Sequence, residues 1–176
     1  YEPSDDNWWL GTHDSNQLIR LSYKIFVGLL NGVPPLPNMI NNIRQSVIEL
    51  NTVCGNLNAS FRFELAEDPV LIGGFPVVDA WFNTSINGGN GWKLENDIRS
   101  NLVAFGWRTD AVNIYMTGTG WGGFQWSDIV TVGADCTALA AGIRGEKPVQ
   151  LHEIGHFFGL CHTFEAVVPC VIRGEL

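Results

Sequence analysis

Three of the four histidines in this chain fall within eleven residues near the end of the sequence. His152, Glu153 and His156 have the spacing of a zinc-binding helix, and Gly159 and His162 follow at further steps of three. Because residues four apart share one helix face, the first two imidazoles can meet at one ion, with the carboxylate beside them. Gly159 can adopt a positive φ that ends the helix and returns His162 to the same ion.

Three neutral imidazoles leave the fourth tetrahedral position of Zn²⁺ open for water, which distinguishes catalytic zinc sites from structural ones. The motif therefore predicts one catalytic zinc ion held by His152, His156 and His162, with Glu153 as the general base. Two alternatives stay open, namely histidines scattered over a helix surface and a bound metal that does no chemistry. Calcium is possible, but no residue pattern indicates it.

The extended pattern His-Glu-x-x-His-x-x-Gly-x-x-His resembles that of the metzincin zinc metalloproteases, and the continuation His-Thr-Phe-Glu is most similar to the pappalysin and cytophagalysin branch. Upstream, Asn41 to Leu50, Phe61 to Phe63 and Val112 to Tyr115 follow the order of elements in such domains. The resemblance implies an endopeptidase that acts on proteins or peptides. Glu153 would accept a proton from water and pass it to the departing amine.

The sequence departs from the metzincin pattern after the histidines. Metzincins carry a methionine-containing turn beneath the zinc, whereas Met39 and Met116, the two methionines here, both precede the motif. Only Thr163 to Leu176 follow the third ligand, which is too short for the lower subdomain that usually supplies this turn. We therefore expect that the chain is a fragment or that its lower subdomain is atypical.

A glycine-rich stretch follows a predicted strand upstream of the motif. Metzincins have a cleft-edge strand there, which pairs with extended substrate. The resemblance therefore implies a substrate-binding segment made of Gly120, Trp121, Gly122, Gly123 and Phe124. A glycine-rich edge bend with tryptophans in a minor core is the alternative. Glu165 either orients a ligand imidazole from outside the ligand set or is a solvated loop residue.

Residue patterns predict a single α+β catalytic domain over residues 1–176, with a twisted mixed β-sheet, a long backing helix and a zinc-ligand helix. This architecture agrees with the upper subdomain that the resemblance implies. Alternating apolar residues predict strands at Leu21–Val27, Phe61–Leu65, Pro76–Phe82, Ala111–Thr117 and Asp128–Val132. Apolar spacings of three and four from Ile40 to Cys54 predict the backing helix.

The remaining segments are a short helix, an exposed turn region, the active-site helix and an N-terminal arm. Ile98, Leu102 and Phe105 predict a short helix closed by Gly106, and residues 83–92 predict an exposed turn region. Residues 148–162 form the predicted active-site helix and third ligand. Residues 1–16 form an N-terminal arm, which is either a lead-in packed by its tryptophans or an acidic latency segment across the zinc cleft.

Composition narrows the possible partners and the cellular location. A formal net charge of −8 with 10 Lys+Arg argues against nucleic-acid binding. No apolar run approaches the roughly 20 residues that cross a bilayer, and the start at Tyr1 lacks a leader, so we expect a soluble, processed chain. Two sequons, Asn58-Ala59-Ser60 and Asn83-Thr84-Ser85, favour a secreted, extracellular protein.

Four cysteines, an even number, are compatible with disulfides in an oxidising compartment. The four cysteines are Cys54, Cys136, Cys161 and Cys170, and a disulfide between Cys161 and Cys170 is one possibility. Buried free thiols, or a bond to a part of the protein beyond this chain, are the other possibilities. The oligomeric state is left open.

A function from another class also fits the composition. Seven tryptophans and glycine- and asparagine-rich loops suit stacking on sugars, so a secreted binding module that keeps zinc without hydrolysis is the alternative. Such an adhesin or carbohydrate binder would have no use for Glu153, which distinguishes the two hypotheses.

Overall fold

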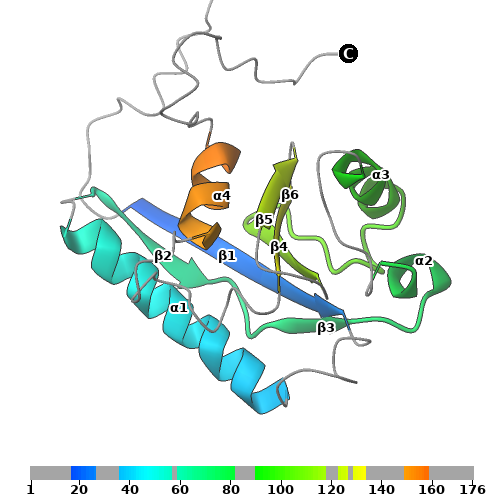
Figure 1. Ribbon diagram of the computed structural model, residues 1–176, viewed down its shortest axis with the longest axis horizontal. Coiled ribbons are helices and arrows are strands. Elements are labelled where there is room, and N and C mark those ends of the chain that lie inside the picture. Colours follow the sequence, from blue (N-terminus) through cyan, green and yellow to red (C-terminus); the bar gives the residue numbers. More distant parts are fainter. Residues whose placement is uncertain are drawn as a thin grey trace, which may run out of the picture.

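The computed structural model describes residues 17–26, 36–56, 59–81, 90–117, 123–126, 129–133 and 149–158. Within these residues, six strands form one sheet, and helices pack against it (Figure 1). The strands are β1 (Gln17–Phe26), β2 (Phe61–Leu65), β3 (Val70–Ile72), β4 (Val112–Thr117), β5 (Gly123–Trp126) and β6 (Ile129–Gly133). The helices are α1 (Leu36–Asn56), α2 (Pro76–Asp79), α3 (Gly91–Ser100) and α4 (Val149–Phe157).

The sheet is mostly parallel and has the order β2-β1-β4-β6-β5, with β3 also pairing with β1. Only the β5–β6 pair among those described is antiparallel, with Gly123 opposite Val132. The central pair β1–β4 aligns Ser22 with Asn113. A mixed sheet with several helices confirms the predicted fold at this coarse level, and β5 lies at one end of the strand order.

Side chains of β1 alternate between the two faces of the sheet. Leu21, Tyr23 and Ile25 are fully buried on the face that α1 and α4 cover. The hydroxyl of Tyr23 reaches Gln150 of α4, which also contacts Ser46 of α1. Figure 1 shows α1 running along β2, which it contacts, and α4 nearer β5 and β6.

The long helix α1 confirms the backing helix predicted from the apolar spacing. Its buried residues recur at intervals of three and four, as an amphipathic helix on a sheet requires. They are Met39, Ile43, Ser46, Val47, Leu50 and Cys54. None of the described helices is long and apolar enough to cross a lipid bilayer.

The segment Pro76–Phe82 was predicted as a strand, and this prediction is wrong. Residues Pro76–Asp79 form the short helix α2, in which Pro76 occupies the first turn. A proline there lacks only an N–H that would have no helical partner, and its fixed φ suits a helix start. Val77 and Val78 suggested a strand because β-branched residues favour strands, but the proline decides the local structure.

The region around α3 also differs from the prediction. Gly91 and Trp92 were expected in an exposed turn, yet they begin α3, while residues 82–89 lie outside the described residues. The helix expected across Ile98 to Phe105 ends at Ser100 instead. Gly106 then adopts φ +60°, which only glycine accepts readily, and closes a turn that buries Phe105.

Candidate metal centre

Helix α4 carries two of the predicted ligands on its outward side. Gln150, Glu153 and Ile154 are buried, whereas His152 is exposed and His156 is partly exposed. This division follows from the 3.6-residue period, which places residues 150 and 154 on one face and residues 152 and 156 on another. The helix lies against β5 and β6 and ends at Phe157, two positions before Gly159.

The two imidazoles converge. The Nε2 atoms of His152 and His156 lie 3.0 Å apart, and the ring centroids are separated by 4.4 Å. At most one of the facing nitrogens can carry a proton at this separation, and the other accepts it, so both nitrogens can face one ion only after that proton leaves. Two Zn–N bonds of about 2.0–2.1 Å at a tetrahedral angle hold their nitrogens about 3.3 Å apart. The pair therefore fits a shared zinc ion after a small ring rotation.

Glu153, the predicted general base, lies on the inner side of α4 and is 7% exposed. Its place next to His152 in the helix keeps the carboxylate within the same turn as the imidazole pair. The candidate site thus combines two imidazoles, one exposed and one partly exposed, with a largely buried carboxylate.

The remaining predicted site residues are only partly within the described part of the chain. His162 and Glu165 lie outside it, as do Gly120, Trp121, Gly122 and the arm of residues 1–16. Among the described residues, no group of three His, Cys, Asp or Glu side chains could hold a metal. Cys54 is a buried free thiol, and the other three cysteines are outside the described ranges.

Gly123 and Phe124 begin β5, which is antiparallel to β6 and is the last strand in the sheet order of the described residues. Helix α4 contacts both of these strands. The order of the sheet therefore brings the end of the predicted substrate-binding segment beside the ligand helix, although about thirty positions separate them in the sequence. An extended peptide could add to such an edge through main-chain hydrogen bonds.

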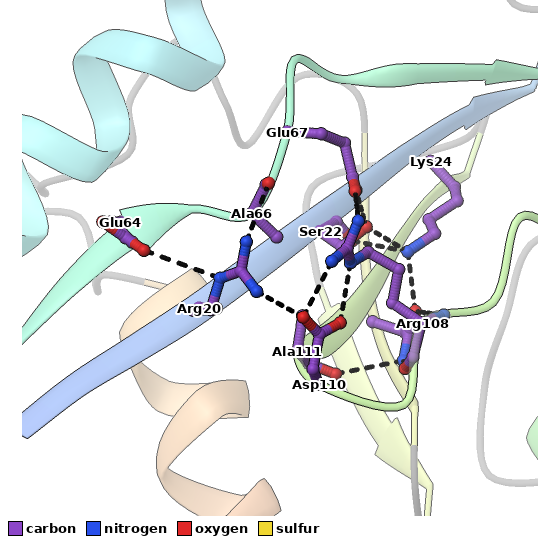
Figure 2. Close-up of polar contacts among 10 residues, drawn as sticks. Arg20, Ser22, Lys24, Glu64, Ala66, Glu67, Arg108, Asp110 and Ala111 are labelled. Carbon is purple, nitrogen blue, oxygen red and sulfur yellow. Dashed lines mark hydrogen bonds and ion pairs between the residues drawn. The ribbon is translucent and has the colours of Figure 1, made fainter.

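A second polar cluster lies on the opposite face of the sheet (Figure 2). Lys24 is fully buried there, and its Nζ donates to Ser22 and to Asn113 Oδ1, the latter at 2.6 Å. The Ser22 hydroxyl donates in turn to Glu67. Asn113 also anchors the preceding loop, because its Nδ2 donates to the carbonyl oxygen of Arg108 at 2.7 Å.

The charged side chains around Lys24 form ion pairs with one another. Arg108 binds Glu67 at 2.5 Å and Asp110 through two hydrogen bonds of 2.8 Å. Arg20 pairs with Asp110 and Glu64. Hydrogen bonds from Arg108 hold the pKa of Asp110 below its usual range. Since each carboxylate already faces a guanidinium, the cluster stabilises the fold and offers no site for a cation.

Burial lowers the pKa of Lys24 from 10.5 to about 7, while Glu67 and Asp110 oppose this shift and Arg108 adds to it. Above pH 7 the folded chain therefore loses a proton that the unfolded chain keeps until about pH 10.5. Stability should rise with pH across this window, by up to about 1.4 kcal/mol per unit. Urea unfolding at several values between about pH 7 and about pH 9.5 measures this rise.

Lys24→Met is the matched variant for this prediction, because methionine fills similar space without a titrating group. Its stability should change less with pH than that of the wild type over the same window. Equal slopes for the two proteins would contradict the lowered pKa of Lys24.

One open depression of about 440 Å³ lies between α2 and the end of α3. Phe75, Leu102 and Val103 line it with other residues, and Arg99 is its only charged lining residue among those described. None of the predicted site residues lines this depression, so it does not belong to the metal centre.

No protein-family model matches this chain, and a comparison with curated proteins finds no similar sequence. The imidazole pair on α4 beside the edge strand is the strongest functional feature within the described residues.

Proposed function

We propose that this chain is a zinc-dependent endopeptidase of the metzincin type. The observation that carries the proposal is the 3.0 Å approach of Nε2 of His152 to Nε2 of His156 on a helix beside an antiparallel edge strand. His162 would complete the ligand set after the turn at Gly159. The resemblance to metzincins supports this assignment through the motif alone.

Glu153 and the two histidines would have different roles in hydrolysis. When bound, zinc supplies Lewis acidity, which polarises a carbonyl group and lowers the pKa of water to about 7. Glu153 would accept the proton of the attacking water and then donate it to the departing amine. The imidazoles of His152 and His156 would hold the ion in place and leave the reacting side open.

Peptides in extended conformation are the proposed substrates. Strand β5 lies at the end of the described sheet order and contacts α4, so a substrate strand paired with it would lie close to the helix that carries the imidazoles. The glycines before Phe124 would let the substrate backbone approach closely. The even number of cysteines and the two sequons support an extracellular location for this activity.

Cleavage of a complex peptide mixture, followed by mass spectrometry, tests the proposal. We expect cuts that disappear after treatment with a zinc chelator and return when zinc is added back. Chelator-resistant cuts would point to another protease in the sample. A chain that holds stoichiometric zinc and makes no cuts would overturn the proposal, and glycan binding by that chain would favour the binding module.

A further inference from the structure

Gln150 joins three elements in the core beneath the metal-binding helix. Its side chain on α4 is 1% exposed, and its Oε1 lies 2.9 Å from the hydroxyl of Tyr23 on β1. The hydroxyl of Ser46 on α1 lies 3.3 Å from the same oxygen and 2.8 Å from the carbonyl oxygen of Ile43. Both links survive a flip of the amide, because a hydroxyl can accept as well as donate.

The hydrogen bonds of Gln150 to Tyr23 and Ser46 are buried, so losing them should lower the stability of the fold. Tyr23 is fully buried, and this burial raises the pKa of its hydroxyl well above the usual range, so the donor stays protonated. Gln150 Nε2 has no hydrogen-bond partner among the described residues. A buried amide that forgoes part of its hydrogen bonding is an exception that needs an explanation, and the remaining bonds of Gln150 tie α4 to β1 and α1.

The position of Gln150 on α4 determines what the link controls. Residues 150 and 154 share the inner face, and Ile154 contributes apolar contacts that tolerate small rotations of the helix. Hydrogen bonds are more directional than apolar contacts. The bonds of Gln150 therefore set the rotation of α4, and that rotation sets where the outward rings of His152 and His156 point.

We propose that Gln150 is a positioning residue for the metal centre, which acts by tying α4 to Tyr23 and Ser46 and so aims the imidazole pair. This inference rests on the proposed metal site. It assigns to Gln150 a role that the histidine motif does not include. Because Gln150 binds Tyr23 and Ser46 from the inner face of α4, its effect should appear in metal affinity and coordination geometry.

The test separates positioning from simple stability. Gln150→Met keeps a similar volume and good helix propensity but removes the partner that the Tyr23 hydroxyl has on α4, so stability and metal affinity should both fall. Adding Tyr23→Phe removes the buried hydroxyl that lost this partner, and stability should return toward the wild-type value. Ser46 retains its bond to the carbonyl oxygen of Ile43 in both variants.

Co²⁺ is the probe, measured through its absorption spectrum and through competition with a chelating dye. We expect the double variant to bind Co²⁺ about tenfold more weakly than wild type, with a changed spectrum, despite its recovered stability. Ile25→Val is the control, since it removes a methyl group from the same core on β1. It should lower stability and leave the Co²⁺ spectrum and affinity unchanged.

The metal-binding measurements test the positioning role of Gln150, and the peptide assay tests the proposed hydrolysis. A double variant with wild-type Co²⁺ affinity and spectrum would overturn the positioning role, whatever the activity of the chain. Wild-type protein that binds Co²⁺ but cuts no peptide would overturn the proposed function, and the positioning role would be decided by the metal data. Wild-type protein that binds neither Zn²⁺ nor Co²⁺ would overturn both.

Discussion

Glu153→Gln should strongly slow peptide hydrolysis while the protein keeps its zinc. The substitution preserves the size of the side chain and removes its basicity, and the residue is not a predicted ligand. General acid–base catalysis contributes about 10²–10⁴-fold to rate, so the turnover number should fall by a factor in this range. Kinetics on one cleaved peptide, with zinc content measured on the same sample, provide the test.

Glu49→Gln on α1 is a matched control for this change. It alters charge in the same way at a partly exposed surface position that contacts Gln45. Its turnover should equal that of wild type. A Glu153→Gln enzyme with undiminished turnover would remove Glu153 from the mechanism, and a variant that lost zinc would indicate that this residue supports the metal.

His156→Ala should lose both zinc and activity. The substitution removes one of two imidazoles whose Nε2 atoms lie 3.0 Å apart. The remaining ring of His152 cannot hold the ion firmly by itself. Activity should therefore fall to the level of chelated wild type. Metal analysis after dialysis and the peptide assay together measure the two losses.

Alanine is the best helix former, so this substitution should leave α4 folded. Circular dichroism and the unfolding midpoint check that the loss comes from the ligand and not from the helix. A His156→Ala chain that retains stoichiometric zinc would show that the metal sits elsewhere. Glu153→Gln and His156→Ala thus differ in one readout, zinc content, which separates a base from a ligand.

Elements with strong local periodicity could be predicted from the sequence. The alternation of Leu21, Tyr23 and Ile25 and the spacing from Ile43 to Leu50 correspond to β1 and α1. Strand β3 was missed, because Val70–Ile72 is too short to show an alternation. Helix α3 was only partly predicted, because Gly91 and the glycines and asparagines before it are typical of a turn.

At the candidate site, the pairing of His152 with His156 could be predicted, because a helix places residues four apart side by side. The role inferred for Gln150 could not be predicted from the sequence, because its hydrogen-bond partner Tyr23 is 127 positions away. The Lys24 cluster was missed for the same reason, since Lys24 and Asn113 meet only through the register of β1 and β4.

The sequence by itself therefore determined the local features of this protein: the faces of its long helix, the alternation of its central strand and the meeting of two imidazoles on α4. These follow from backbone geometry, which repeats over a few residues. The tertiary structure alone decided that β5 lies beside α4 and that Tyr23 meets Gln150. Contacts between distant residues depend on which strands pair and how helices pack over them, and no local pattern contains that information.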